Sequence, residues 1–143
     1  MITQTLTTSF KVELLQGVHN FGPTSPNTFK IALYSSTASL GANTTVYSTT
    51  GEVTGTGYTA GGNTLTISTF PTAGGTTTAY INFDNAVWTS ASFTAGGALI
   101  YNSTQGNKAV AVLNFGGNKT PSNGTFTVQF PAASSTTAII RVA

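Results

Sequence analysis

Few side chains in this chain of 143 residues could act as an acid, a base or a metal ligand. They are one histidine, His19, and three carboxylates, Glu13, Glu52 and Asp84. Most hydrolytic mechanisms need two carboxylates, or a nucleophile with a base and a third group that orients the base. Serine and threonine hydroxyls are abundant, but no motif places a base beside one. We therefore expect no enzyme, no catalytic residue, no metal site and no cofactor.

Each of these four residues has a structural interpretation. His19 falls in the last turn of a predicted helix, where a partial positive charge suits the helix dipole. Glu13 falls on the polar side of the same helix, and we expect it to be solvated or at a contact. Asp84, in the run NFDNAVW, is interpreted as a turn residue between two strands. Glu52 lies in the Gly/Thr segment TTGEVTGTGY, which could equally be an irregular strand.

The tetrapeptide Thr-Ala-Gly-Gly occurs three times, ending at Gly62, Gly75 and Gly97. A phosphate-binding loop would lead into a helix, usually with a lysine. Two copies lead instead into the strand patterns NTLTIST and ALIYNS, the third precedes three threonines, and none carries the lysine. We predict turns and bulges, where glycine supplies a positive φ or lets two backbones approach closely.

Trp88 and the tyrosines could form a sugar-binding surface, because aromatic faces stack on pyranose rings. The five tyrosines are Tyr34, Tyr47, Tyr58, Tyr80 and Tyr101. The alternative is that these rings pack in the core and at its rim, with one polar tip satisfied. We favour packing, because few Asp, Asn or Arg residues accompany the rings to hold sugar hydroxyls.

The chain has an unusually low content of charged residues, 6%, against roughly 25% in ordinary globular domains. Threonine is common, and its β-branched side chain favours strands with a neutral polar surface. The five basic residues are scattered: Lys11, Lys30, Lys108, Lys119 and Arg141. A nucleic-acid-binding surface would need a basic stripe with aromatic residues in it, so we expect no direct contact with nucleic acid.

Neither a membrane partner nor a secretory route is expected from the sequence. No apolar run approaches the ~18 residues of a membrane span. The first residues, MITQTLTTSF, lack the charged and apolar regions of a signal peptide. The chain has no cysteine, which excludes disulfides and thiolate metal sites.

We expect one domain over residues 1–143, beginning with a polar, β-prone arm, residues 1–8, and a helix, residues 9–21. Four apolar residues recur at helical spacing in the second segment: Phe10, Leu14, Val18 and Phe21. Ser9 can cap the helix start and Gly22-Pro23 stops it. Gly17 weakens the interior by about 1 kcal/mol relative to alanine. The apolar face is expected to pack on the rest of the chain.

Beyond Pro26 the hydrophobic period changes from that of a helix to that of a strand. TFKIALYSS sets Phe29, Ile31 and Leu33 opposite Lys30, Ala32 and Tyr34. NKAVAVLNF sets Ala109, Ala111, Leu113 and Phe115 opposite Lys108, Val110 and Val112. TFTVQF places Phe126, Val128 and Phe130 on one face. Short strands separated by Gly, Asn and Pro predict a mainly β fold, an antiparallel sandwich or barrel over residues 28–143.

Five segments carry a family resemblance: SFKVELLQGVHNF, TFKIALYSS, TTVYSTTGEVTGTGYTAGG, VWTSASFTAGGALIYNS and KAVAVLNFGG. They resemble small Thr/Gly-rich structural proteins of the virions of tailed bacteriophages, particularly phages of aquatic bacteria. The likeness continues through FTVQFP and IIRVA and so covers nearly the whole chain. It implies a structural component of the virion, without indicating which part of the particle.

Together with the low charge, the resemblance leads us to expect a capsid decoration (cement) protein. It would be made in the bacterial cytoplasm and placed on the capsid surface, where it bridges major capsid subunits and contacts copies of itself as a homo-oligomer. The arm is the expected contact: Ile2, Thr3, Gln4, Thr5, Leu6, Thr7 and Thr8. Two alternatives stay open, a tail component (tube, baseplate or fibre) and a carbohydrate-binding module for host-surface glycans.

Overall fold

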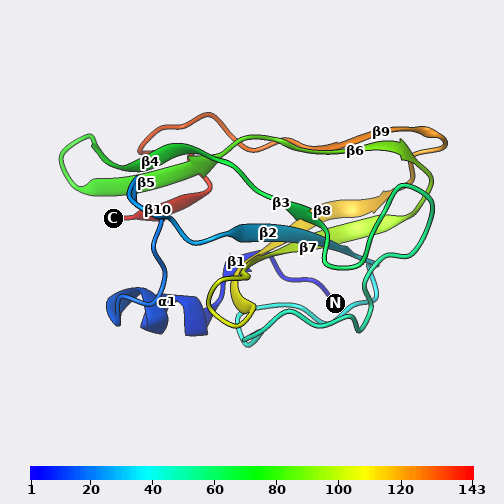
Figure 1. The fold of residues 1–143 in the computed structure, drawn as a ribbon, viewed down its shortest axis with the longest axis horizontal. Coiled ribbons are helices and arrows are strands. Elements are labelled where there is room, and N and C mark those ends of the chain that lie inside the picture. Colours follow the sequence, from blue (N-terminus) through cyan, green and yellow to red (C-terminus); the bar gives the residue numbers. More distant parts are fainter.

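The middle layer of the molecule is a five-stranded antiparallel sheet in the order β1-β8-β7-β2-β3 (Figure 1). The computed structural model describes the whole chain, Met1–Ala143. The strands of this sheet are β1 (Thr5–Leu6), β8 (Lys108–Lys119), β7 (Ala95–Asn102), β2 (Phe29–Tyr34) and β3 (Asn63–Thr64). Aliphatic and aromatic residues dominate β2 and β7, as is typical of strands buried on both faces.

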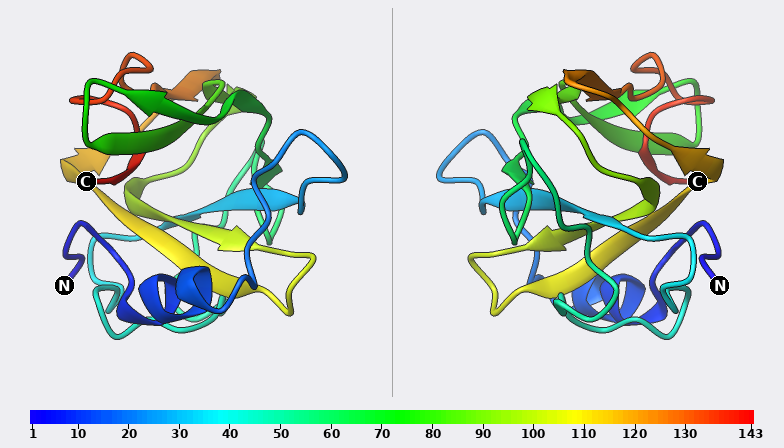
Figure 2. Two further views of the ribbon diagram at one scale, coloured as in Figure 1. Left: turned by 90° about the vertical axis from the view of Figure 1, so that its left-hand side faces the viewer. Right: turned by 90° about the vertical axis from the view of Figure 1, so that its right-hand side faces the viewer.

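Two smaller antiparallel sheets cover one face of the middle sheet (Figure 2). They have the orders β10-β5-β4 and β6-β9, with β4 (Ile67–Gly74), β5 (Thr78–Phe83), β6 (Ala86–Ala91), β9 (Gly124–Val128) and β10 (Ile140–Val142). The opposite face carries helix α1 (Thr8–Leu15), the N-terminal residues and the loop that follows β2. The predicted fold, mainly β and antiparallel with one short N-terminal helix, is confirmed.

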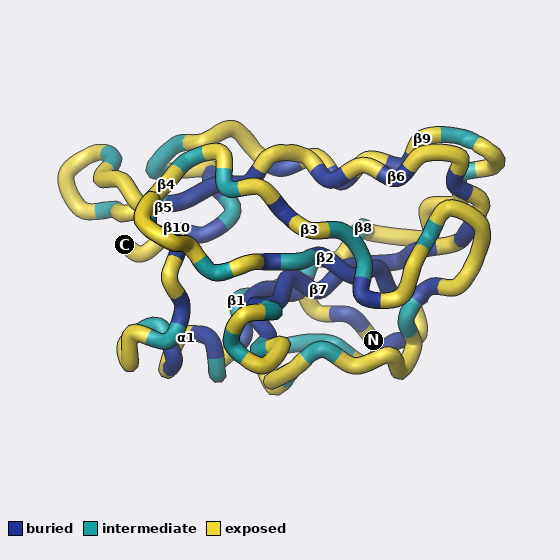
Figure 3. The backbone as a smooth tube through the Cα atoms, in the orientation of Figure 1, coloured by how far each residue is buried: buried dark blue, intermediate teal, exposed yellow.

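Alternate residues of the central strands enter two apolar clusters, one on each face of the middle sheet. On β2, one set joins a cluster of 22 buried residues between the sheets: Phe29, Ile31 and Leu33. The intervening Ala32 and Tyr34 join a cluster of 8 buried residues on the opposite face. The predicted alternation is therefore confirmed, and the buried residues concentrate in β2 and β7 (Figure 3).

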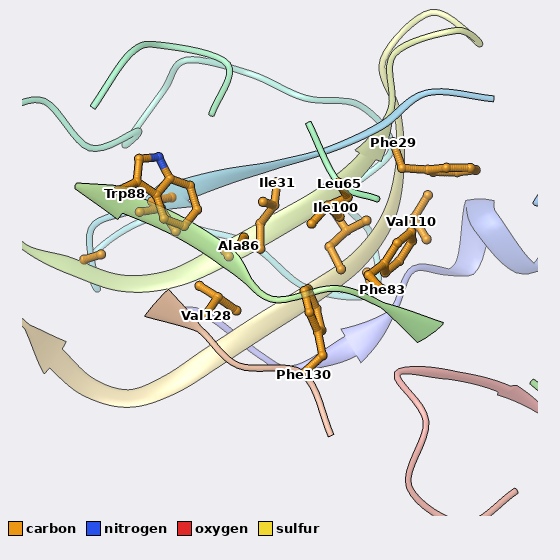
Figure 4. Packing of buried hydrophobic residues seen from close by; sticks show 14 of the residues in the cluster. Phe29, Ile31, Leu65, Phe83, Ala86, Trp88, Ile100, Val110, Val128 and Phe130 are labelled. Atoms are coloured by element: carbon orange, nitrogen blue, oxygen red, sulfur yellow. The ribbon is translucent and has the colours of Figure 1, made fainter. Parts of the chain in front are cut away.

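The larger cluster holds the two β layers together (Figure 4). From the smaller sheets, Phe83 and Phe130 pack with ring centroids 5.8 Å apart, and Phe83 lies 6.0 Å from Phe29 of the middle sheet. Aromatic pairs at such distances stabilise beyond the area that they bury. Phe126, Val128 and Phe130 all belong to this cluster, which confirms their predicted common face.

The predicted faces of β8 are wrong at one point because the strand contains a β-bulge. Ile100 of β7 pairs with Ala111, but the next residue, Tyr101, pairs with Ala109, so Val110 is the extra residue. An extra residue interrupts the period-2 alternation of a strand. Ala109 therefore lies in the smaller cluster and Ala111 in the larger one, not on one face as the alternation predicted.

The start of α1 differs from the prediction. The helix begins at Thr8, and its N-cap is Thr7 rather than Ser9. The Thr7 hydroxyl accepts a hydrogen bond from the backbone N–H of Phe10 at 3.2 Å. Thr7 is 0% exposed, so this cap is part of the packed layer.

The predicted helix is also wrong beyond Leu15, because Gly17 ends it. Gly17 adopts a φ of 73°, and the N–H of Val18 donates back to the carbonyl of Glu13 at 3.0 Å. A left-handed glycine after the last turn is a common way to satisfy the terminal carbonyls of a helix. The chain then returns to β2 as a loop, in which Phe21 stacks on Phe29 at a ring distance of 4.3 Å.

The N-terminal arm is not free. Thr5 and Leu6 form β1 and pair with β8, and Ile2 makes a parallel bridge to Leu40. Ile2 is 5% exposed and belongs to the smaller apolar cluster. The edge of β8 and the loop after β2 therefore hold these residues of the arm within the same chain.

The three Thr-Ala-Gly-Gly copies form turns and a bulge, as predicted. Gly62, with a φ of 73°, lies in the turn before β3, and Gly75, with a φ of 61°, lies between β4 and β5. Gly97 lies in β7 beside a register shift, where a Cβ would stand 2.5 Å from the carbonyl oxygen of Leu113.

Gly62→Ala should lower the free energy of unfolding by about 3 kcal/mol, measured by urea unfolding. The added methyl group would overlap the carbonyl of Ile31, and the left-handed φ adds strain. Gly106→Ala is the matched control, because Gly106 has a φ of 67° but no atom within 4 Å of the added methyl. It should cost only about 1–2 kcal/mol. Equal losses in the two variants would contradict the close approach at Gly62.

Candidate functional site

The structure brings together two of the four ionisable residues that the sequence singles out. Glu13 on α1 and His19 in the following loop are neighbours, and Lys108 at the start of β8 joins them. Glu52 lies elsewhere, hydrogen-bonded to tyrosines. Asp84 is exposed between β5 and β6, and its N–H donates to the Thr66 carbonyl at 2.9 Å. Asp84 lies between two strands, as predicted, but in a short connection that does not form a turn.

Glu13 is buried, which corrects the expectation of a solvated side chain on the polar side of α1. The residue is 8% exposed. Its Oε2 lies 3.2 Å from Lys108 Nζ and 3.8 Å from His19 Nε2. The Lys108 side chain is 45% exposed and that of Glu13 only 11%. Removing the lysine would leave a mostly buried carboxylate without its charge partner, which is destabilising. The apolar periodicity of the segment gave no sign that a carboxylate would face inward.

His19 is fully enclosed, with a side chain that is 0% exposed. Its Nδ1 lies 3.0 Å from the amide nitrogen Nδ2 of Asn102, which also donates to Oδ1 of Asn27 at 2.9 Å. The other end of the Asn102 amide, Oδ1, accepts two backbone N–H groups of the following turn. Because Asn102 donates to Nδ1, the neutral ring of His19 carries its proton on Nε2, facing Glu13.

Burial lowers the pKa of His19 below its ordinary value of 6.5. The charge of Glu13 opposes this effect and that of Lys108 adds to it. The ring packs against Phe10, at a centroid distance of 4.9 Å, and Phe29, at 6.4 Å. His19 is therefore neutral at pH 7. The prediction that it lies in the last turn of the helix is wrong, because α1 ends at Leu15 and His19 packs among aromatic rings in the following loop.

The His19 cluster, defined as Glu13, His19, Asn102 and Lys108, joins α1 and the loop after it to the ends of β7 and β8. The two polar neighbours of His19, Asn102 and Glu13, are not nucleophiles that it could activate, and its ring is closed to solvent. A general base must reach the proton that it removes. The arrangement therefore fastens the helix to the sheet and has no open reacting position.

Glu52 forms a second polar cluster, together with Tyr47, Tyr58, Gly61 and Tyr101. Its Oε1 accepts from the Tyr58 hydroxyl at 2.6 Å and the Gly61 N–H at 2.7 Å, and its Oε2 accepts from the Tyr47 hydroxyl at 2.7 Å. The Tyr101 hydroxyl donates to the carbonyl of Gly61 at 2.7 Å. Hydrogen bonds to a carboxylate are short and stronger than neutral ones. This Glu52 cluster fixes the loop between β2 and β3 against the middle sheet.

The tyrosines around Glu52 act as hydrogen-bond donors and stay protonated. Burial, with the nearby charge of Glu52, raises the pKa of Tyr101 to about 12. The same causes raise the pKa values of Tyr34, Tyr47 and Tyr58 well above the ordinary 10.0. A phenol that donates to a carboxylate is held in its neutral form. These residues therefore support the fold and are not poised to transfer a proton.

Trp88 is a core residue, as the packing interpretation predicted, but its buried Nε1 has no hydrogen-bond partner, so the predicted satisfied polar tip is wrong for this ring. It is 3% exposed and packs against Tyr58 and Phe126, with ring centroids 6.2 Å and 5.9 Å away. Tyr34 and Tyr101 are buried as well. Trp88, Tyr34 and Tyr101 therefore have no free face on which a sugar could stack, whereas Tyr47, Tyr58 and Tyr80 are only partly buried.

One surface feature was not found from the sequence, a groove of about 710 Å³ between β8 and β9. We call it the β8–β9 groove. Its walls are Gln4, Leu113–Phe115, Asn118–Pro121, Thr125–Pro131 and Ile139. The alternating apolar residues of both strands were visible in the sequence, but nothing there indicated that these consecutive strands would diverge instead of pairing. A second hollow, of about 880 Å³, lies against the loop after β2. The β8–β9 groove differs from it in being bordered by two strands.

Comparisons with other proteins assign no function to either cluster or to the groove. The chain matches no protein-family model, no curated protein and no solved structure. No group of three or more His, Cys, Asp or Glu side chains is placed to hold a metal ion. The structure contains no helix of the length and apolarity that crossing a bilayer requires. The resemblance to virion proteins thus stays an expectation, and function must be argued from this chain's own contacts.

Acid should weaken the fold through His19. Because the pKa of His19 is lowered in the folded chain, the unfolded chain takes up the proton first as the pH falls below 6.5. The stabilisation is complete above pH 6.5 and declines as the pH falls through the folded-state value. His19→Gln keeps an acceptor for Asn102 and should flatten the decline of the free energy of unfolding, measured in urea, as the pH falls below 6.5.

Glu13→Gln provides the opposite change for comparison. It removes the negative charge that raises the pKa of His19, so the decline with falling pH should become steeper. Parallel pH profiles for the unchanged protein and His19→Gln would show that His19 does not produce the dependence.

Glu52→Gln should lower the free energy of unfolding by about 1–2 kcal/mol, because it replaces charge-assisted hydrogen bonds by neutral ones. It should also lower the pKa of Tyr101 from about 12, since the negative charge that opposes the phenolate is gone. Urea unfolding and the ultraviolet absorbance of the phenolate measure the two effects. Asp84→Asn removes an exposed carboxylate and should change stability by less than about 0.5 kcal/mol; a comparable loss there would contradict a special role for Glu52.

Proposed function

We propose that this chain is a structural protein of the virion of a tailed bacteriophage, and specifically a capsid decoration protein. In this role it binds the outer face of the head, bridges neighbouring major capsid subunits and contacts copies of itself. The observation that carries the proposal is the use of the ionisable side chains. Glu13, His19 and Glu52 all hold the chain's own layers together, and none of them faces an open site. The resemblance of the five sequence segments to virion structural proteins of tailed bacteriophages is the reason for naming this kind of particle.

The surface of the chain suits contacts that do not depend on charge. With Glu13 buried and Glu52 bonded internally, Asp84 is the exposed carboxylate. The exposed large apolar side chains are Met1, Val12, Leu15, Val46, Phe70, Val87 and Val142. Salt screens interactions between exposed charges but leaves apolar contacts intact. Copies with few charges can also pack closely on a shell with little mutual repulsion.

The arm contributes to such an interface only through the residues that it still exposes. Ile2 and Thr7, two of the seven residues expected to contact a neighbour, are buried within the chain itself. Thr3, Gln4 and Thr8 face outward. The role of the arm stays a prediction for these exposed side chains, while the anchored ones stabilise the subunit.

Quantitative mass spectrometry of purified particles tests the proposal. In virions of the phage that encodes this chain, we expect hundreds of copies per particle, in a fixed ratio to the major capsid protein. The protein should stay bound to emptied heads when sodium chloride is raised from low to molar concentration, because its contacts are apolar. Heads stripped of it should lose DNA at a lower temperature, and re-adding purified protein should restore the original temperature.

A handful of copies per particle, co-purifying with tails, would overturn the decoration role and favour a tail component. Absence from the particle would overturn the virion assignment altogether. Release of the protein at moderate salt would contradict the charge-independent contacts even if the copy number were high.

A further inference from the structure

The β6-β9 sheet has only two strands, and neither of them pairs with a third strand. β9 pairs with β6 along Ala86–Ala91, and no strand lies on its other side. A strand that pairs on one side only presents a row of unpaired backbone N–H and C=O groups on the other. Two-stranded sheets are marginal alone, and a third strand is the usual completion. The open edge of β9 therefore has the chemistry of an acceptor for another strand.

β8 does not pair with this edge, and a groove lies between the two strands. The partners of β8 on β1 end at Val112. On β7, Gly97 pairs with Asn114 and the next pair is Ala95 with Lys119, so residues 115–118 have no strand partner. The space between this bulged segment and β9 is the β8–β9 groove, of about 710 Å³. Figure 1 shows β9 beside β6 at the top of the molecule with β8 below them.

The floor of the groove matches the side-chain spacing of an extended chain. Phe126, Val128 and Phe130 recur at every second residue on the β9 side, and Leu113 and Phe115 do so on the β8 side. Leu113, Phe115 and Ile139 are only partly buried and pack on the larger apolar cluster. Alternate side chains of an incoming strand would point to this apolar floor, and the others to solvent.

The charge of the groove gives the incoming strand a direction. Lys119 is the charged residue among those that line it, and no carboxylate is present. Lys119 lies near the loop that leads into Gly124, the first residue of β9. A strand antiparallel to β9 ends beside Gly124, so an acidic residue at its C-terminal end would meet Lys119.

We propose that the β8–β9 groove binds an extended segment of another protein, which adds as an antiparallel third strand to β9 and places an acidic residue beside Lys119. The segment alternates small apolar and hydroxyl side chains, to match the apolar floor and the solvent. The site follows from strand edges and lining residues of this chain alone. Only the further statement that a neighbouring virion subunit supplies the segment rests on the proposed function.

Two capped peptides of identical composition test the proposal: Lys-Thr-Val-Thr-Val-Thr-Val-Glu, and the same central run with Glu first and Lys last. Titration followed by amide NMR should shift the resonances of residues 113–119 and 124–130. Alternate β9 amides that exchange rapidly in the free protein should become protected.

The peptide that ends in Glu should bind about fivefold more tightly than the reversed one, because the reversed peptide replaces a surface ion pair with Lys119 by a repulsion. N-methylation of its alternate amides should weaken binding at least about tenfold, because strand hydrogen bonds are lost.

Lys119→Glu should reverse which of the two peptides binds more tightly. Lys11→Glu is the matched control, because both lysines are exposed and both variants change the charge by the same amount. The control, on α1, should bind both peptides as the unchanged protein does. Shifts outside the groove, equal binding of the N-methylated peptide, or no saturable shift at millimolar peptide would overturn the proposal. Concentration-dependent shifts of the same residues without peptide would also overturn it, by making a second copy of this chain the occupant. Peptide binding together with absence from virions would instead overturn only the proposed function.

Discussion

The structure depends on a middle sheet that is buried on both faces, because each face must then be covered. All eight residues of β7 are buried, and the alternate residues of β2 and β7 enter different apolar clusters. The two smaller sheets, β10-β5-β4 and β6-β9, cover one face and bury a large core rich in aromatic residues. The other face is covered by one short helix, the arm and a long loop. The cluster there holds only eight buried residues, none of them from α1, whose Phe10 belongs to the larger cluster. This second cover has too little apolar area to define one arrangement, so it relies on polar contacts.

Three of the few ionisable residues, Glu13, His19 and Glu52, make these polar contacts. Glu13 and His19 fasten α1 to the ends of β7 and β8, and Glu52 fastens the loop between β2 and β3 through tyrosine hydroxyls and the Gly61 N–H. Both groups act on the same layer. Acid disturbs the first by charging His19, and alkali disturbs the second by ionising tyrosines whose pKa values are raised in the folded chain. The helix and loop layer is therefore the part of the molecule that is sensitive to pH, while the apolar core between the sheets is not.

The sequence predicted the features that local periodicity controls. The alternation of β2, the common face of Phe126, Val128 and Phe130, and the glycine turns all depend on residues close together in the chain. The features that it missed depend on distant partners. Glu13 faces inward because Lys108 and His19 are there to meet it. The bulge at Val110 is visible only in the pairing with β7. Gly17 was noted as a weak helix position, although a glycine followed by an apolar residue is also the pattern of a helix end.

The same division between local pattern and distant partners explains the groove. Strand periodicity identifies β8 and β9 but does not determine whether consecutive strands pair with each other. Here β8 belongs to the middle sheet and β9 to a smaller one, so the loop between them crosses from one layer to the other. At the β2 side of the sandwich the segment between β3 and β4 also crosses, and Leu65 is buried there. At the β8 side, residues 115–118 have no partner on β7. β8 and β9 stay unpaired, and the open edge of β9 borders an apolar floor. A chain with few charged residues has little else with which to discriminate a partner.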